Sequence, residues 1–350
     1  MFGLFGLNKI LGLDVGNAAV KACEISVSGK KAKTAKLTKF QITKMNDGAY
    51  KNGEVLNPSA LTTVLKAATE KMKTTKTALG LSGSSVMVKK ITIPKMDVSL
   101  LPEQMRWEAE QYIPYNIDEV NIDYVVLSPG ASEDSMDLLL VAAQQNRVKQ
   151  FVDVVLEAKL TPEVVDVSSF ALANCFNFNY PEMADQRLAI LDIGAFFTHF
   201  VVVQNTEVVF SRDIPSGGQN FDSELSSNLG VTVEEARQIK ESEDDLPDIA
   251  LDTLKSASAR FSEQVMGAME FFIETTQSPK IEKVFLTGGA SISLGLVESL
   301  ATGLNAEVEY LDVLKNISPA AEILTDVSER DLQYRSAVAI GLALRKVGDS

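Results

Sequence analysis

The pattern that decides the fold occurs twice in this sequence, first as Ile10-Leu-Gly-Leu-Asp-Val-Gly-Asn-Ala-Ala-Val-Lys21 and again as Leu188-Ala-Ile-Leu-Asp-Ile-Gly-Ala-Phe-Phe-Thr-His-Phe200. Each copy has an apolar run, then Asp, an apolar residue and Gly, and then a second apolar run. Apolar runs with β-branched residues predict buried strands. Glycine at the turn tolerates a positive φ, so each copy predicts a tight hairpin.

The two predicted turns indicate a phosphate site, because backbone N–H groups at such turns point outward and can cradle phosphate. We expect these amides from four residues: Gly16, Asn17, Gly194 and Ala195. Asp14 and Asp192 precede the turns, and we expect their carboxylates to hold Mg²⁺ through water, since Mg²⁺ gives up its waters reluctantly. Two facing hairpins would hold the phosphates of a nucleotide between two lobes.

Other residues near the turns leave details of this site open. Lys21 lies on the strand that returns from the first turn, and the sequence does not fix whether it reaches the phosphates. Thr198 is a candidate phosphate donor after the second turn. Phe196 and Phe197 are bulky where small or hydroxyl residues would suit phosphate, so the fit of the second turn stays open.

A third element, Lys283-Val-Phe-Leu-Thr-Gly-Gly-Ala-Ser291, reads as a strand that runs into a Gly-rich turn and a helix. Such a turn lets backbone approach a nucleotide closely. With the two Asp-Gly hairpins, in this order and spacing, it resembles the actin/Hsp70/hexokinase ATPase superfamily. The resemblance implies a two-lobed actin-like (ribonuclease H-like) α/β fold that binds ATP or ADP with Mg²⁺. It places three residues near the nucleoside: Gly288, Gly289 and Ala290.

The resemblance implies further site residues in the second lobe. Gly217 and Gly218 begin a predicted helix and are expected at the nucleotide. Lys240 and Glu241 match a Lys-Glu pair that lies against adenine and ribose in the superfamily, although such residues also commonly decorate a helix surface.

Hydrolysis needs a positioned water, usually oriented by Glu, Gln or Asp. Superfamily members tend to carry an acid at the start of the helix that follows the last strand of lobe 1. Ser168 stands at that place here, and Asp166 is nearby as a strand-end residue. The resemblance therefore implies nucleotide binding with slow or negligible hydrolysis.

Longer stretches resemble the PilM family of type IV pilus assembly proteins, and the resemblance covers nearly the whole chain. The most specific stretch is Arg106-Trp-Glu-Ala-Glu-Gln-Tyr-Ile-Pro-Tyr115. Others are Val164-Val-Asp-Val-Ser-Ser-Phe-Ala-Leu172, Ile214-Pro-Ser-Gly-Gly-Gln-Asn-Phe221 and Ala337-Val-Ala-Ile-Gly-Leu-Ala-Leu-Arg345. This resemblance implies a cytoplasmic ATP-binding scaffold, peripheral at the inner membrane. Such a scaffold binds the cytoplasmic N-terminal peptide of PilN, joins the PilN/PilO complex and communicates with the pilus motor ATPases.

The predicted elements divide the chain into four parts. Lobe 1 takes residues 1–81, together with 164–187 and about 326–350. An α+β subdomain of the FtsA type is inserted at 82–163. The core of lobe 2 takes 188–213 and 276–325, with a small subdomain at 214–275.

The inserted subdomain carries the candidate partner surface. A helix is predicted over Leu101–Ile113, with an apolar face of Leu101, Met105, Ala109 and Tyr112. Trp107 falls about 200° from Met105 at ~100° per residue, so it is a candidate binding anchor off the core face. Trp107 and Tyr112 are the residues assigned to partner binding, and Val86–Ile93 would offer a sheet edge beside them.

Composition excludes several classes of function. A net charge of −14 disfavours binding to a nucleic-acid backbone. His199 is the only histidine, and Cys23 and Cys175 are the only cysteines, so a His-based metal site, a His-containing triad and a disulfide framework are not expected. No apolar run has the ~18–20 residues of a membrane span, and the apolar segment Met1–Leu7 lacks the basic start of a signal peptide.

Three alternatives compete with the PilM interpretation. An FtsA-like filament-forming ATPase would end in an amphipathic membrane helix, for which Leu344–Ser350 has no room. A sugar or acetate kinase would carry acceptor-binding insertions that the sequence does not show. A degenerate actin-like scaffold without nucleotide remains as the third.

Overall fold

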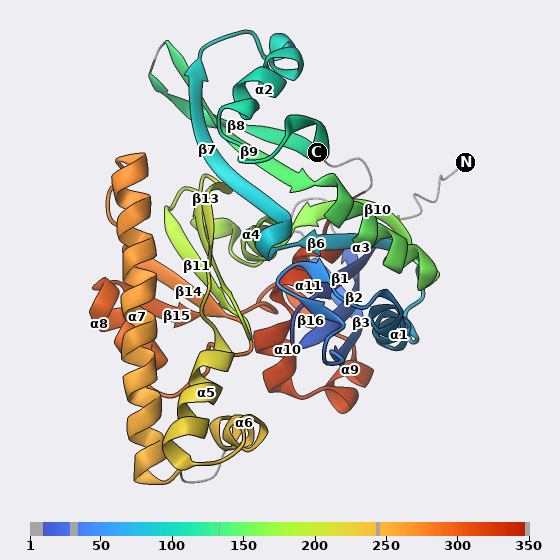
Figure 1. Ribbon diagram of the computed structural model, residues 1–350, viewed down its shortest axis with the longest axis vertical. Coiled ribbons are helices and arrows are strands. Elements are labelled where there is room, and N and C mark those ends of the chain that lie inside the picture. The colour runs from blue at the N-terminus through green and yellow to red at the C-terminus, as the bar shows by residue number, and fades with distance from the viewer. Residues whose placement is uncertain (1–9, 29–33, 133, 243–245, 347–350) are drawn as a thin grey trace.

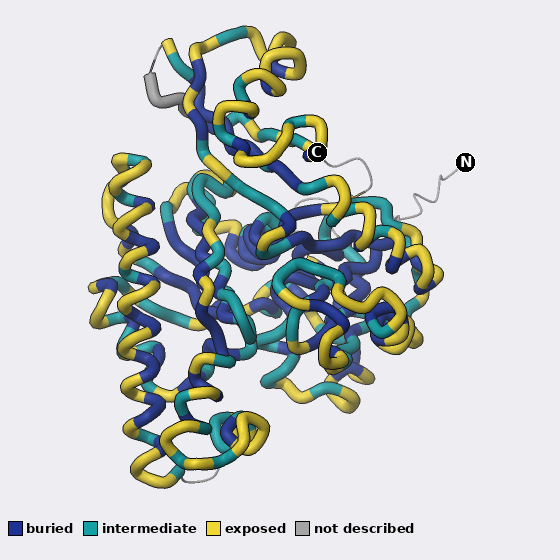
Figure 2. The backbone as a smooth tube through the Cα atoms, viewed as in Figure 1, coloured by how far each residue is buried: buried dark blue, intermediate teal, exposed yellow. Residues whose placement is uncertain are grey.

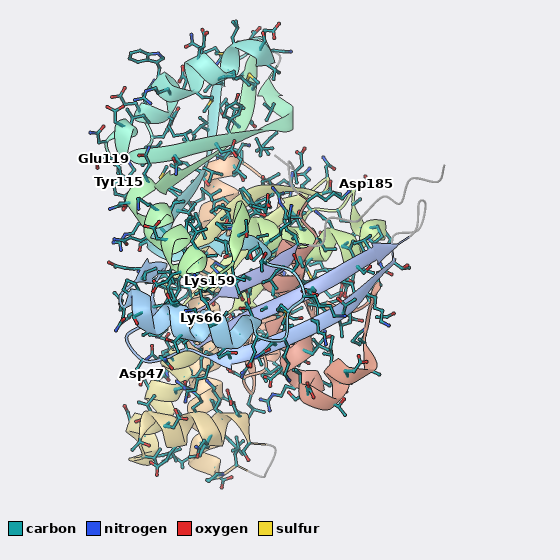
Figure 3. All side chains as sticks on the ribbon, turned by 90° about the vertical axis from the view of Figure 1, so that its right-hand side faces the viewer. Asp47, Lys66, Tyr115, Glu119, Lys159 and Asp185 are labelled. Carbon is teal, nitrogen blue, oxygen red and sulfur yellow. The ribbon has the colours of Figure 1, made fainter. Side chains whose placement is uncertain are left out.

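The computed structural model describes residues 10–28, 34–132, 134–242 and 246–346. The apolar N-terminal segment and residues 347–350 lie outside these ranges. Figure 1 shows two lobes side by side with a smaller unit above them, and Figure 3 shows the same unit rising above the lobes in a view turned by 90°. Within the described residues, no helix combines the length and the hydrophobicity needed to cross a bilayer.

Lobe 1 is built on a six-stranded sheet of order β10-β6-β1-β2-β3-β16. Its strands are β1 (Leu11–Val15), β2 (Ala19–Ser28), β3 (Thr34–Lys44), β6 (Lys76–Leu81), β10 (Thr161–Val167) and β16 (Ile317–Pro319). Helices α1 (Pro58–Thr69) and α3 (Gln145–Glu157) cover one face, and α4 (Ser168–Asn179) and α11 (Ala337–Ala343) cover the other. The short hairpin β4 (Tyr50–Lys51) and β5 (Glu54–Val55) precedes α1.

Lobe 2 is built on a five-stranded sheet of order β13-β12-β11-β14-β15. Its strands are β11 (Leu188–Ile193), β12 (Thr198–Gln204), β13 (Glu207–Ile214), β14 (Lys283–Thr287) and β15 (Glu307–Tyr310). The long helix α7 (Asp248–Thr276) and α8 (Leu296–Leu304) cover its outer face, and α5 (Gly218–Leu229) and α6 (Val233–Glu241) lie at its lower end in Figure 1. Helices α9 (Ala321–Asp326) and α10 (Glu329–Arg335) follow β16 and connect it to α11 in lobe 1.

Helix α4 is packed between the two sheets, so the lobes share one core. Its apolar residues are joined in a single cluster with Cys23 of the first sheet and with Ile190 and Val201 of the second. The buried residues of α4 are spread around the helix rather than along one face, which is typical of an interior helix, and Figure 2 shows the strands around α4 as buried. Cys23 and Cys175 are buried free thiols in this region.

The inserted unit is a three-stranded antiparallel sheet of order β7-β9-β8 with one helix on it. Its elements are β7 (Val86–Pro94), α2 (Leu101–Glu110), β8 (Val120–Ser132) and β9 (Ser135–Gln144). Leu101, Met105 and Ala109 are buried against the sheet, as the helical spacing predicts. The helix ends at Glu110, three residues earlier than predicted, and a turn at Gln111 and Tyr112 leads into Pro114.

Two parts of the chain lie differently from the predicted division. Helix α3 was expected in the insertion, but Phe151 and Val154 are packed with Leu61 of α1 in the core of lobe 1. Strand β16 pairs with β3 from Ile317, so the chain returns to lobe 1 before residue 326. Four 3₁₀ turns complete the described elements: η1 (Gly83–Ser85), η2 (Val98–Leu100), η3 (Ile117–Glu119) and η4 (Pro181–Met183).

Candidate functional site

The two Asp-Gly sequences form equivalent hairpins, as predicted. In the first turn the Gly16 N–H donates to the Ala19 carbonyl at 3.1 Å, and in the second the Gly194 N–H donates to the Phe197 carbonyl at 2.9 Å. The strand register then places Asp14 opposite Lys21, and Asp192 opposite His199. Each hairpin therefore carries one acid and one basic residue side by side, two residues outside its turn.

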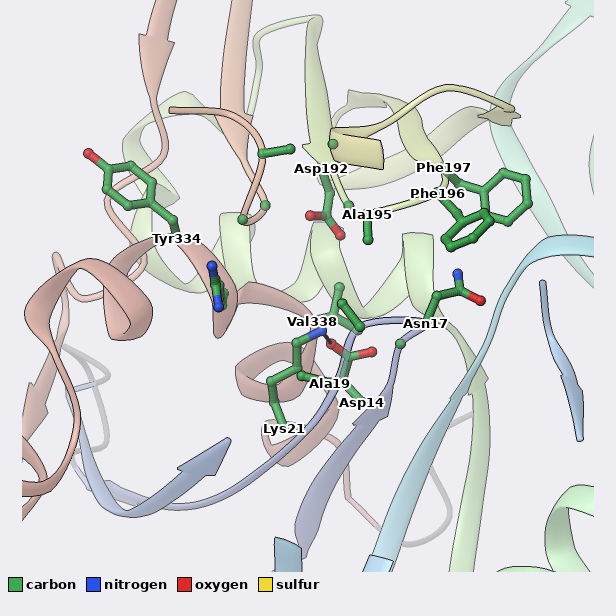
Figure 4. A pocket seen from close by; sticks show the side chains of 18 of the residues that line it. Asp14, Asn17, Ala19, Lys21, Asp192, Ala195, Phe196, Phe197, Tyr334 and Val338 are labelled. Carbon is green, nitrogen blue, oxygen red and sulfur yellow. Dashed lines mark hydrogen bonds and ion pairs between the residues drawn. The ribbon is translucent and has the colours of Figure 1, made fainter. Parts of the chain in front are cut away.

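The hairpins meet at a cavity of about 440 Å³ between the lobes. Figure 4 shows Asp14 and Asp192 reaching into it from opposite lobes, with Tyr334 at one end and Phe196 and Phe197 at the other. The cavity brings together most of the residues predicted from sequence: Asp14, Gly16, Asn17, Lys21, Ser168, Asp192, Gly194, Ala195, Gly218, Lys240, Glu241, Gly288, Gly289 and Ala290. A volume in this range suits a small-molecule ligand.

The amides available to a ligand differ in part from those expected. The N–H groups of Gly16 and Gly194 close their own turns, so they are already bonded. The N–H groups of Asn17 and Ala195, each one residue further on, have no partner among the described residues. These are the amides that the turns present to the cavity.

Thr198 and Gly217 do not line the cavity. The Thr198 hydroxyl is buried and donates to the Ser216 carbonyl at 2.8 Å, because strand alternation places Thr198 on the face opposite His199. Gly217 instead supports the second turn, since a Cβ there would lie 2.5 Å from the Gly194 carbonyl oxygen. Gly218, next in the chain, donates its N–H to that same oxygen at 2.9 Å.

Asp166 and Ser168 have different surroundings. Asp166 is buried outside the cavity and forms an ion pair with Arg345 at 3.4 Å, and burial raises the pKa of its carboxyl despite that cation. An acid held in this way is not placed to orient water at a nucleotide. Ser168 begins α4 and lines the cavity.

The Thr-Gly-Gly turn after β14 is fixed by close backbone contact. Gly288 has a φ of +92°, and a Cβ there would lie 2.4 Å from the Ile193 backbone. The Ala290 N–H donates to the Ile193 carbonyl at 2.9 Å, which ties this turn to the strand before the second hairpin. Gly289 faces the Arg335 guanidinium, 2.9 Å from the position of a Cβ.

Lys240 and Glu241 make contacts that the sequence did not indicate. Lys240 forms a buried ion pair with Asp222 and also donates to the Gly218 carbonyl at 3.1 Å. Glu241 accepts from Arg335 at 3.2 Å. Because Arg335 is on α10 and Glu241 on α6, this pair connects elements that are 94 residues apart in sequence at one end of the cavity. No local pattern could have identified Asp222 or Arg335.

His199 lines the cavity, although the sequence indicated no role for it there. Its Nδ1 lies 2.5 Å from an Asp213 carboxylate oxygen. Burial opposes its charge, but the Asp213, Asp192 and Asp14 carboxylates raise the pKa of His199 to about 9. The imidazolium form is therefore favoured at neutral pH. The position opposite Asp192 in a four-residue turn was a signal that could have found it.

Two acids, Asp14 and Asp192, line the cavity from the two hairpins (Figure 4). Burial raises the pKa of Asp192, and the charges of His199 and Lys21 only partly oppose this shift. Asp14 is already paired with Lys21 at 2.9 Å. Among the described residues, no three His, Cys, Asp or Glu side chains cluster as direct metal ligands. Two acids on facing hairpins fit a hydrated Mg²⁺ that also needs phosphate oxygens.

Phe196 and Phe197 stand at the mouth of the cavity, beside Asn17 in Figure 4. The Lys51 ammonium lies 5.2 Å from the centre of the Phe196 ring, so this ring is held by a cation from lobe 1.

The two partner residues lie in different surroundings. Trp107 is 70% exposed on α2, far out on the inserted unit, as its angle from Met105 predicts. Tyr112 instead packs against the inserted core, with the Lys89 ammonium 5.0 Å from its ring centre. A second cavity of about 220 Å³ lies at the base of the unit, where β7 meets β13, and is lined in part by Val86, Val88 and Arg212.

This fold and cavity define a member of the actin-like ATPase class: two lobes, a hairpin with an Asp-Gly turn from each, and a Gly-Gly turn beside them. A family model described as "Type IV pilus assembly protein PilM" matches residues 12–347. The chain therefore belongs to the PilM family.

Solved structures agree with this assignment. A structure described as "PilM-PilN type IV pilus biogenesis complex" is 26% identical with a TM-score of 0.83, covering 97% of this chain and 99% of that chain. The ethanolamine utilization protein EutJ from Carboxydothermus hydrogenoformans (12% identity, TM-score 0.59, 98% and 92% covered) shares the fold. So does MreB 5 of Spiroplasma citri bound to AMPPNP (13%, 0.51, 96% and 95%).

Proposed function

We propose that this protein is an ATP-binding scaffold of the type IV pilus machine that binds the N-terminal peptide of PilN. The observation that carries the nucleotide half is the pair of Asp-Gly hairpins whose free amides and carboxylates converge on one cavity between the lobes. The observation that carries the partner half is membership of the PilM family, together with similarity to a PilM–PilN complex.

The cavity has a donor set suited to ATP or ADP with Mg²⁺. The amides of Asn17 and Ala195 and the cations Lys21 and His199 would meet phosphate oxygens. Asp14 and Asp192 would hold the hydrated metal, which neutralises phosphate charge. The Gly288–Ala290 turn, Lys240 and Glu241 would border the nucleoside end. Binding of AMPPNP by the MreB 5 neighbour supports this use of the shared fold.

A thermal unfolding experiment tests nucleotide binding. Mg-ATP should raise the melting temperature, because a ligand present at 100 times its Kd stabilises the folded state by about 2.7 kcal/mol. Asp14→Ala removes a metal-binding carboxylate, and Gly289→Val would place a branched side chain against Arg335, so each should abolish the rise. An unchanged melting curve of the native protein at millimolar Mg-ATP would contradict the proposal.

The partner peptide would bind on the inserted unit. Trp107 is exposed, and aromatic residues often anchor interfaces, so we retain it as a contact residue. β7 is an edge strand in the described sheet and borders the smaller cavity, which offers an extended peptide both hydrogen-bonding groups and a pocket of mixed polar and apolar lining. Tyr112 would contribute only through its exposed edge. Through PilN the protein would sit in the cytoplasm at the inner membrane, next to the PilN/PilO complex and the motor ATPases.

Titration with a synthetic PilN N-terminal peptide tests partner binding. Trp107 is the only tryptophan, so its fluorescence reports on the outer surface, and Trp107→Phe keeps an aromatic ring as a matched control for Trp107→Ala. Val88→Lys places a charge in the smaller cavity instead. If only Val88→Lys weakens binding, the peptide lies at the base of the unit. Absence of binding to the native protein would contradict the partner assignment.

A further inference from the structure

The 3₁₀ turn η1 (Gly83–Ser85) is where the chain enters the inserted unit. It joins β6 of the first sheet to β7 of the inserted sheet. Ser82, directly before it, lines both the large cavity between the lobes and the smaller cavity at the base of the unit. A displacement of this turn would therefore change the shape of both cavities.

One hydrogen-bond chain connects η1 to the first phosphate turn. The Asn17 side-chain oxygen accepts the Asn52 N–H at 2.8 Å. The Asn52 carbonyl in turn accepts the Ser84 hydroxyl at 2.9 Å and the Ser84 N–H at 3.3 Å. Asn17 lines the large cavity. A ligand that displaces the first turn would therefore also displace Ser84, because Asn52 is hydrogen-bonded to both Asn17 and Ser84.

A second chain connects η1 to the second hairpin. His199 lines both cavities and contacts Asp213 on β13. The other oxygen of Asp213 accepts the Gly83 N–H at 2.9 Å. Burial disfavours the Asp213 charge, yet His199 and the Gly83 amide keep the pKa of this carboxyl below its ordinary value. The His199–Asp213 salt bridge of lobe 2 is therefore hydrogen-bonded to the backbone of η1, the turn that follows β6 of lobe 1.

The contacts around η1 leave it little freedom to move independently. Gly83 has a φ of +63°, and a Cβ there would lie 2.5 Å from the Asn52 side-chain oxygen. On the other side, a Cβ on Gly53 would lie 2.3 Å from the Ser82 carbonyl oxygen. Packed elements with such close contacts shift together rather than deform. The turn must follow the Asn52 hairpin on one side and Asp213 on the other.

We propose that η1 transmits the nucleotide state of the large cavity to the inserted unit, through Asn17–Asn52–Ser84 from lobe 1 and His199–Asp213–Gly83 from lobe 2. A nucleotide that draws the two phosphate turns together changes the distance between the ends of these chains, and β7 with its smaller cavity responds. This inference rests on the proposed nucleotide binding. Linkage requires that a peptide bound at β7 changes nucleotide affinity by the same factor as the nucleotide changes peptide affinity.

Amide hydrogen exchange of residues 83–88, with and without saturating Mg-AMPPNP, tests the proposal without any peptide. In the native protein we expect the nucleotide to slow exchange there by at least about fivefold, which is the change expected if the smallest usual coupling free energy between sites adds to the free energy of local opening. Asp213→Ala removes the acceptor for Gly83 and should reduce the slowing to less than about twofold at the same saturation. The double variant His199→Gln/Asp213→Ala avoids an unpaired buried charge if the single variant does not fold.

Asp137→Ala is the matched control. Asp137 is also a buried acid paired with a cation, Lys90 at 2.8 Å, but it lies in the inserted sheet away from η1. This variant should keep the native response. If the native protein binds AMPPNP with no change at 83–88, or if the Asp213 variants keep the full response, the proposal is overturned while nucleotide binding stands. If AMPPNP does not raise the native melting temperature, both fail.

Discussion

Lys21 Nζ lies 2.9 Å from Asp14 Oδ2, directly across the first hairpin. His199 has the same place opposite Asp192 in the second hairpin. The two lobes therefore present the same acid–base arrangement to one cavity, but with different bases. Lys21 donates a hydrogen bond to Asp14 in its own hairpin. His199 instead contacts Asp213, which lies outside the cavity, and makes no hydrogen bond to Asp192.

Lys21→Ala should lower the affinity for Mg-ATP by about tenfold or more, because a hydrogen bond to a charged group contributes about 1.5–3 kcal/mol. Lys71→Ala is the control: Lys71 pairs with Asp326 at 3.0 Å on the exposed surface and should leave affinity unchanged. Isothermal titration calorimetry measures both. Equal affinities of the Lys21 variant and the native protein would show that this lysine only pairs with Asp14 and does not contact the nucleotide.

Gly288→Ala should destabilise the folded protein by about 2 kcal/mol or more, since a strained backbone conformation alone costs about 1–3 kcal/mol. The new Cβ would also strike the Ile193 backbone. Gly267→Ala is the matched change in α7, where a Cβ meets nothing, and it should be neutral or slightly stabilising. Thermal unfolding compares the two. If the Gly288→Ala protein has the same melting temperature as the native protein, the described conformation of the turn is contradicted.

The His199–Asp213 pair should make stability fall at alkaline pH. The folded pKa of His199, about 9, lies above its unfolded value near 6.5, so the folded state binds the proton more tightly. This stabilisation is fully present below about pH 6.5 and is lost as pH rises through about 9, and it amounts to about 3 kcal/mol. The double variant His199→Gln/Asp213→Asn should lack this decline between pH 6.5 and 9.5, as measured by melting temperature.

Hydrolysis by the purified protein should be slower than the ~1–100 s⁻¹ typical of kinases. Ser168 has no carboxylate to orient water, and Asp166 is engaged with Arg345. Ser168→Glu should raise the rate, while Ser168→Ala should leave it unchanged. Phosphate release distinguishes these outcomes. Steady release near ~1 s⁻¹ by the native protein alone would show that another residue positions water.

The sequence predicted the hairpins and the fold because their signals are local. An apolar strand, Asp-x-Gly and a second strand fix a turn wherever they occur, and Gly288 requires its positive φ for the same kind of reason. The face of Thr198 was also accessible to strand alternation, since its partner across the hairpin is the buried Ile193. Thr198 was wrongly assigned to the phosphate site because the prediction considered the turn alone and not which residues pair across the hairpin.

The remaining site residues could not be predicted because they depend on tertiary packing. Arg335 reaches Glu241 only after α10 and α6 are brought together from opposite lobes. The α3 assignment failed for a related reason, because its apolar face fits α1 as well as it would fit the inserted sheet. A periodic pattern shows that a helix has a buried face but does not say which layer covers it.

Helix α11 packs very closely on β1, and this contact has a consequence for how the chain folds during its synthesis. Gly12 is so near this helix that a Cβ there would lie 2.0 Å from the Ala339 carbonyl oxygen, and Ile340 and Leu342 belong to the core shared with α4. The ribosome makes β1 more than three hundred residues before α11. The part of the first sheet that α11 covers therefore stays bare until α11 itself is made, and nascent chains that stall before residue 337 should be captured by chaperones instead of completing their fold.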